Sequence, residues 1–189
     1  MAKRKLKVKN KKLKIFLTQN SMLVIGLILI SIFCVWRYHQ ERILSFNTKT
    51  VAEFKSSGIK PVYVKSYPVG VDIDIKNTSI NNGVWAIHPN NANYLINSAG
   101  IGDGGNIIIY GHNRDDIMGP IRYIKDGAIV EILGSDGKTY IYEVIKTDVV
   151  DPNNLSYIGE TNDETLTLYT CTGFLDSKRY IVVAKLKEY

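Results

Sequence analysis

The sequence is poor in the side chains that bind metals through sulfur or nitrogen, since its 189 residues include 2 cysteines and 3 histidines. None of these residues shows the short Cys/His spacing of a zinc site. Asp72 and Asp74 alternate along one segment and Asp115 and Asp116 adjoin in another, but nothing singles out a set of carboxylates for calcium. We therefore expect no metal.

No segment has the context that a dinucleotide cofactor requires. Residues 100–105 fit the pattern G-x-G-x-x-G literally. That fingerprint needs a helix behind it, so that the phosphate lies at the helix N-terminus. Here a strand-like run follows at once, so we interpret the glycines as a loop and expect no cofactor.

Acidic residues are absent from positions 1–14, which carry eight lysines and arginines. Subtracting these eight from the 24 basic residues leaves 16 against 18 acidic ones, a net charge of −2 for the remainder. The basic charge is thus a tail, which can attract anionic lipid headgroups. A nucleic-acid-binding domain is not expected.

Charge is also absent from Met22 to Trp36, and the apolar stretch extends back to Ile15. Residues 15–36 are long enough to cross ~30 Å of hydrocarbon as a helix. A buried core helix and a cleaved secretion signal are the alternatives, but no small-x-small cleavage site follows. We expect an uncleaved transmembrane signal anchor in the cell membrane. The positive tail places the N-terminus in the cytoplasm and the rest outside.

This topology leaves Cys171 as the lone cysteine of the exported part, because Cys34 lies in the membrane segment. An unpaired cysteine outside the reducing cytoplasm is a liability, an intermolecular bridge or a reactive thiol. Its position at the end of a predicted strand favours the reactive thiol. Residues 37–58 in between have a weak helical pattern that Gly58 would stop, and we interpret them as a partly helical linker.

From residue 61 onward the apolar residues recur with a period of two, which predicts strands. Asp136-Gly137 indicates a tight hairpin. About eight strands with short connections and almost no helix predict an all-β fold, either a barrel or a sandwich. The expected strands are 62–64, 71–75, 83–87, 106–110, 128–133, 140–145, 166–171 and 179–186.

Three side chains near strand ends are the candidates for chemistry. Cys171 alternates with Leu168, so the thiol faces away from the core. His112 follows Gly111 at a strand exit, with His88 as the competing histidine. Arg179 opens the last strand, eight residues after the cysteine. A hairpin-like return would bring the guanidinium and the thiol into one groove.

Together these features resemble the sortase family of cysteine transpeptidases. The specific match is Thr-Leu-Tyr-Thr-Cys at 167–171, supported by the segments 106–112 and 179–184. The resemblance covers residues 59–189 and implies an eight-stranded β-barrel behind an N-terminal transmembrane helix. The short interval from cysteine to arginine and the single N-terminal anchor are more similar to class D and E members.

The resemblance implies that Cys171 attacks a sorting signal of Leu-Pro-x-Thr-Gly type between Thr and Gly and forms a thioester. His112 would act as an imidazolium and general acid, and Arg179 would stabilise the oxyanion or hold the peptide carbonyls. The implied partners are proteins with C-terminal sorting signals and an amine on a cell-wall precursor or a pilin-like protein. The expected supporting and substrate-binding residues are Thr170, Tyr169, Asn113, Leu155 and Tyr157.

Two other functions stay open at this point. A cysteine peptidase with a similar site would release only hydrolysis product, because water instead of an amine would attack the thioester. A non-catalytic surface-binding domain would be indifferent to loss of the thiol.

Overall fold

The computed structural model describes residues 20–48 and 58–187, and the chain divides into two compact units, Met1–Glu41 and Arg42–Tyr189. In the first unit, helix α2 (Ser21–Arg42) continues past the apolar run that ends at Trp36. Residues 15–19 of the expected membrane segment lie outside the described residues. Within α2, Ser21–His39 is long and apolar enough to cross a membrane. Its large apolar side chains are exposed around the helix, which suits lipid better than water.

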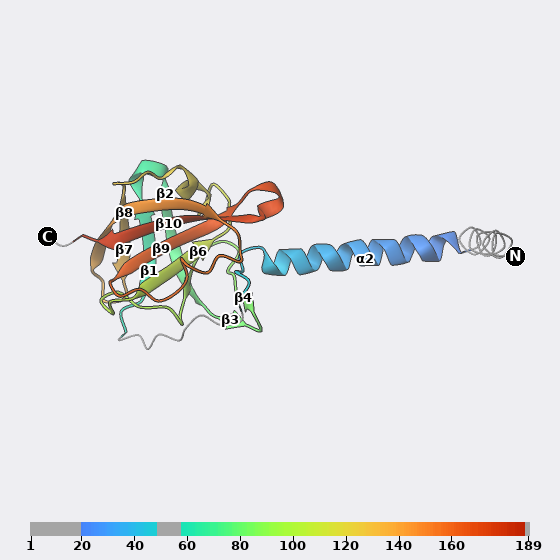
Figure 1. Ribbon diagram of the computed structural model, residues 1–189, viewed down its shortest axis with the longest axis horizontal. Helices are drawn as coiled ribbons and strands as arrows, with labels where there is room; N and C mark the ends of the chain where they lie inside the picture. Colours follow the sequence, from blue (N-terminus) through green and yellow to red (C-terminus); the bar gives the residue numbers. More distant parts are fainter. Residues whose placement is uncertain (1–19, 49–57, 188–189) are drawn as a thin grey trace, which may run out of the picture. The chain divides into compact units, whose positions relative to one another are not determined.

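The second unit is an eight-stranded closed barrel, as the resemblance implied and not the sandwich that the strand pattern left open (Figure 1). The strands follow the order β1-β2-β5-β6-β9-β10-β8-β7 around the barrel, which leaves no open edge. They are β1 (Pro61–Ser66), β2 (Val71–Thr78), β5 (Ala92–Leu95), β6 (Asn106–Gly111), β7 (Ile129–Gly134), β8 (Thr139–Val150), β9 (Thr165–Thr172) and β10 (Lys178–Leu186).

Two strand pairs are parallel, β2 with β5 and β6 with β9, and all other barrel pairs are antiparallel. The expected hairpin at Asp136-Gly137 joins β7 and β8, where Gly137 adopts φ 80°. The short 3-10 helices η1 (Tyr67–Val69), η2 (Gly119–Tyr123) and η3 (Phe174–Asp176) lie in the connections.

The alternation of side chains separates two apolar layers. Ile107, Ile109, Leu166 and Leu168 point into the barrel and belong to its core. Side chains on the opposite face of β6 and β9 belong to a second cluster on the outer side, namely Ile108, Tyr110, Tyr169 and Cys171. The predicted inward orientation of the leucines is therefore correct.

One expected strand is not part of the barrel. In the segment 83–87 only β4 (Val84–Trp85) forms, and it pairs with β3 (Ile80–Asn81) in a separate two-stranded sheet. The missing barrel strand is β5, which the sequence did not predict. All four of its residues are buried between β2 and β6, so no alternation of polar and apolar residues marks it.

Substituting Ile109 by alanine is expected to lower the free energy of unfolding by about 3 kcal/mol, because it leaves a cavity in the barrel core. Ile109 is fully buried, whereas Ile145 on β8 is 51% exposed. The same substitution at Ile145 is the control and is expected to cost less than about 1 kcal/mol. Urea denaturation followed by circular dichroism measures both. Equal losses would contradict the assignment of Ile109 to the core.

Candidate active site

Cys171 lies near the C-terminal end of β9 and points to the outer face of the barrel. Its neighbour across the antiparallel pair is Arg179 on β10, in direct register. On the other side, β6 runs parallel to β9 and its last residue, Gly111, pairs with Thr170. The predicted hairpin return therefore places the thiol and the guanidinium on adjacent strands.

His112 follows β6 directly and so emerges at the same end of the sheet as Cys171. Its backbone carbonyl accepts hydrogen bonds from the amides of Arg114 (2.9 Å) and Met118 (3.2 Å), which fix the turn after the strand. Gly111 is required by this turn, because a Cβ there would lie 2.6 Å from Cγ of Met118. The competing histidine, His88, lies outside the barrel strands, and its amide donates to Oδ1 of Asn93 (2.7 Å).

Arg179 is 3% exposed and holds three backbone carbonyls. Its Nη1 donates to the carbonyls of Asp176 and Lys178, both at 2.9 Å, and its Nη2 donates to that of Ser45 at 2.7 Å. The buried Nε has no hydrogen-bond partner. The residues described include no carboxylate in an ion pair with it. Three N–H groups of the guanidinium donate to these carbonyls, so in the described part of the chain the Nε–H and the second Nη2–H remain without an acceptor.

The segment Ile43–Asn47, which we call the strap, passes over these residues. The Cys171 thiol donates to the carbonyl of Ile43 (2.8 Å), and the Tyr169 hydroxyl donates to that of Leu44 (3.0 Å). With the Arg179 bond to Ser45, three successive strap carbonyls meet three side chains of β9 and β10. The sequence indicated a partly helical linker here, and no candidate site residue was expected in it.

Burial controls the charge of the site. It raises the pKa of the Cys171 thiol to about 12, although nearby Arg179 acts in the opposite direction. The pKa of His112 is lowered, first by burial and then by Arg114, and Asp176 partly offsets this. Burial thus favours the neutral form of both groups, whereas the role that the resemblance implies for His112 uses its imidazolium. The physical reason is burial, which disfavours the charged form of each group.

Aromatic rings surround the cysteine on this face. Tyr169 stacks on Tyr110 with 5.1 Å between the ring centroids, and Trp85 meets both rings edge to face. Tyr169, expected as a groove wall, is fully buried beneath the strap. The role of Trp85 was missed because it depends on the small β3–β4 sheet, which no local pattern relates to β9.

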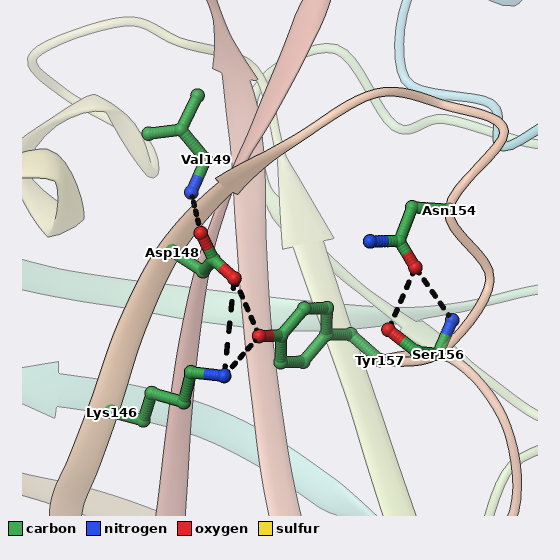
Figure 2. Close-up of polar contacts among 6 residues, drawn as sticks. All are labelled: Lys146, Asp148, Val149, Asn154, Ser156 and Tyr157. Atoms are coloured by element: carbon green, nitrogen blue, oxygen red, sulfur yellow. Dashed lines mark hydrogen bonds and ion pairs between the residues drawn. The ribbon is translucent and has the colours of Figure 1, made fainter.

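Residues 151–164 connect β8 to β9 and contain the expected peptide-binding segment. Figure 2 shows how its Tyr157 is held, with the hydroxyl donating to the Asp148 carboxylate at 2.6 Å and receiving a bond from the Lys146 ammonium. The Asn106 side chain donates to the carbonyls of Tyr157 (3.0 Å) and Gly159 (2.9 Å). Asn106 was not expected to have this role. These bonds fix the segment beside β6.

The remaining expected residues have different environments. The Thr170 hydroxyl is buried and donates to the carbonyl of Gly111 (2.8 Å), so it ties β9 to the turn that carries His112. Oδ1 of Asn113 is buried without a hydrogen-bond partner. Leu155 is 39% exposed on the β8–β9 connection. Residues 20–48 and 58–187 contain no group of three His, Cys, Asp or Glu side chains that could hold a metal ion.

A family profile described as "Sortase domain" matches residues 66–187. The candidate sortase YwpE of Bacillus subtilis (strain 168) is 30% identical over 82 residues, which cover 42% of this chain and 79% of that protein. Sortase A of Listeria monocytogenes is 33% identical over 88 residues, which cover 44% of this chain and only 39% of the relative.

The barrel also resembles solved structures. A Clostridium perfringens sortase D5 transpeptidase superposes with a TM-score of 0.56 and 24% identity, over 68% of this chain and 79% of that one. At this level of identity the likeness concerns the fold alone.

Proposed function

Since the chain belongs to the sortase family, whose members are cysteine transpeptidases, we propose that it cleaves an LPxTG-like sorting signal between Thr and Gly and transfers the acyl group to an amine. The acceptor belongs to a cell-wall precursor or to another surface protein. The catalytic groups in this proposal are Cys171, His112 and Arg179.

The first half of the reaction forms a thioester. Cys171 passes its proton to His112, and the thiolate attacks the carbonyl carbon of the signal's Thr. The carbon–nitrogen bond to Gly then breaks, and His112 returns the proton to the departing amine. Arg179 donates to the oxygen that becomes negative in the transition state, a role that suits its permanent charge and forked donors.

The second half transfers the acyl group. An incoming amine attacks the thioester carbon and gives its extra proton to the site, with His112 as the base. The carbon–sulfur bond breaks, and the sulfur leaves as the thiolate that the proton restores to a thiol. Water competes with the amine, so the outcome depends on which of them reaches the thioester first.

The observation that carries this proposal is the register of β6, β9 and β10. Gly111 pairs with Thr170 and Arg179 pairs with Cys171, so three neighbouring strands deliver His112, the thiol and the guanidinium at one end of the sheet. These three residues are not adjacent in the chain, and the pairing of the three strands supports their assignment to one site.

The test is a reaction of the purified chain with a fluorescent LPxTG peptide and an amine acceptor, followed by mass spectrometry. The expected products are the released Gly-containing fragment and the peptide joined to the amine. Hydrolysis product alone, at saturating amine, would favour the purely hydrolytic cysteine peptidase. A peptide library with varied positions would then define the sorting motif.

Replacing Arg179 by lysine is expected to lower kcat/KM about a hundredfold, because an ammonium keeps the charge but loses the fork of donors. The guanidinium of Arg179 makes three bonds to carbonyls, and one nitrogen cannot reproduce them. Arg122→Lys is the matched control, since Arg122 lies on η2 and donates to the carbonyl of Gly119. Wild-type kinetics for Arg179→Lys would exclude a role for the forked donors.

We also propose that α2 anchors the enzyme in the cell membrane, with the N-terminus in the cytoplasm and the barrel outside. The basic residues at positions 1–14 and the apolar stretch Ser21–His39 support this orientation. Protease added to intact cells should digest the barrel and spare the tail, and the opposite pattern would contradict the orientation.

A further inference from the structure

Tyr157 is held by two strands that flank the pair carrying Cys171 and Arg179. Its hydroxyl donates to the Asp148 carboxylate of β8 (2.6 Å), and its carbonyl accepts from the side chain of Asn106 on β6 (3.0 Å). In the order of the barrel, β9 and β10 lie between β6 and β8. Tyr157 thus connects the two strands on either side of the proposed site.

The register of the sheet places Asp148 close to the proposed nucleophile. Cys171 pairs with Arg179, and the pair two residues earlier on β9 joins Tyr169 to Ile181. Ile181 in turn pairs with Asp148 on β8. Residues two apart on a strand share a face and lie about 7 Å from each other. Asp148 is therefore on the outer face, one row of paired residues away from the thiol.

The bond between Tyr157 and Asp148 closes the start of the β8–β9 connection into a loop, residues 148–157. Inside this loop, Oδ1 of Asn154 accepts bonds from the amide of Ser156 (3.1 Å) and from its hydroxyl (2.7 Å), as Figure 2 shows. Leu155 lies in the same loop, and its side chain is 39% exposed. The loop therefore has internal order and presents an apolar side chain to solvent.

Two charged side chains hold the Tyr157 hydroxyl. The Lys146 ammonium donates to it and lies 3.9 Å from the Asp148 carboxylate. The hydrogen bonds from Tyr157 and from the amide of Val149 hold the pKa of Asp148 below its usual range, so this carboxylate is charged at neutral pH. Hydrogen bonds to charged groups are stronger than those between neutral groups. We call Lys146, Asp148 and Tyr157 together the latch.

The ring of Tyr157 has a separate role from its hydroxyl. It packs against the outer cluster that contains Cys171. The next residue, Ile158, is 3% exposed and belongs to that cluster. A phenylalanine at position 157 keeps the ring for this packing and removes only the hydroxyl.

We propose that Lys146 and Asp148 are positioning residues for the acyl-donor peptide, which hold the loop 148–157 in its peptide-binding shape through the Tyr157 hydroxyl. The inference rests on the proposed function for the identity of that peptide. Tyr157 was expected to bind substrate, but the chain itself already engages its hydroxyl. Leu155 is the residue that the latched loop offers to the peptide.

The first test measures hydrogen exchange of the full chain in detergent micelles by mass spectrometry, without any peptide. The connection contains amides bonded within it, such as that of Ile158 to the carbonyl of Leu155 (3.1 Å). Tyr157→Phe is expected to raise the exchange rate of residues 151–164 about tenfold, because it removes a hydrogen bond to a charged group. Wild-type exchange in this variant would overturn the proposal.

Tyr63→Phe is the matched control, because the barrel has a second cluster of the same composition. The Tyr63 hydroxyl donates to Asp72 at 2.6 Å, and the Lys65 ammonium lies 3.8 Å from the same carboxylate. These residues lie on β1 and β2, neither of which pairs with β9 or β10. Tyr63→Phe should therefore leave the exchange of residues 151–164 at the wild-type rate. Equal acceleration of this segment in both variants would show a general loss of stability and contradict the latch.

Peptide kinetics test the positioning role itself. Tyr157→Phe should raise KM for the LPxTG peptide about tenfold and change kcat less than about twofold, because the latch acts on binding and not on the thioester chemistry. Asp148→Asn keeps an acceptor for the hydroxyl but removes the charge, so its KM should rise only about threefold. Faster exchange with an unchanged KM would overturn the positioning role.

The two measurements separate this inference from the function on which it rests. Faster exchange together with a higher KM supports both. Faster exchange in Tyr157→Phe, with no turnover of the LPxTG peptide even by the wild-type chain, supports the latch as the element that orders the loop. That result overturns the proposed acyl donor instead.

Discussion

Replacing Cys171 by alanine is expected to lower kcat/KM for the sorting peptide by about a thousandfold or more, because no other group can form the thioester. Cys171 is the one described cysteine within the barrel, and the second free cysteine, Cys34, lies on α2. The alanine variant removes one sulfur from a buried position, so the fold should persist. Its unfolding midpoint, measured beside the kinetics, separates lost chemistry from lost structure.

Cys34→Ser is the matched control for this experiment. Its side chain is exposed on helix α2. We expect wild-type kinetics from Cys34→Ser in detergent. If Cys171→Ala retained full function instead, the non-catalytic surface-binding domain would become the better description.

Replacing His112 by alanine is expected to lower kcat/KM by about a hundredfold to ten thousandfold, the usual contribution of general acid–base catalysis. His112 follows β6 at the sheet end where Gly111 pairs with Thr170, one residue before Cys171. His88→Ala is the control and should keep wild-type activity, because His88 lies between β4 and β5, neither of which pairs with β9. Loss of activity in His88→Ala with full activity in His112→Ala would reverse the assignment.

The pH dependence of kcat/KM gives a second test of the proposed pair of Cys171 and His112. The reactive form carries one proton shared between Cys171 and His112, so activity is lost when both are protonated or both deprotonated. The lowered pKa of His112 places the acid limb below 6.5, and the raised pKa of Cys171 places the alkaline limb above 9.0. Activity should therefore be flat across neutral pH. An acid limb above 6.5 would contradict the burial of His112.

Several features of the barrel follow from local patterns. Leu166 and Leu168 face the core, and Cys171 faces outward, because successive side chains of a strand alternate. The short Cys171-to-Arg179 interval predicted a hairpin, and the register of β9 with β10 agrees with it. The motif at 167–171 indicated the family that the matching domain at residues 66–187 shows.

Other features have no local signal. Strand β5 is buried on both faces between β2 and β6, so its four residues show no alternation. Asn106 holds the β8–β9 connection through carbonyls more than fifty positions away. A hydrogen bond of this kind depends on which strands become neighbours, and a window of adjacent residues contains no information on that.

The amino-acid sequence by itself determined the strand periodicity, the apolar membrane candidate and the choice of three candidate side chains for the proposed chemistry, since each is a property of neighbouring residues. Only the tertiary structure decided that Ile43 covers Cys171, a contact between positions 128 residues apart. It also decided the protonation of the site, because the pKa of a thiol depends on the segments that exclude water from it.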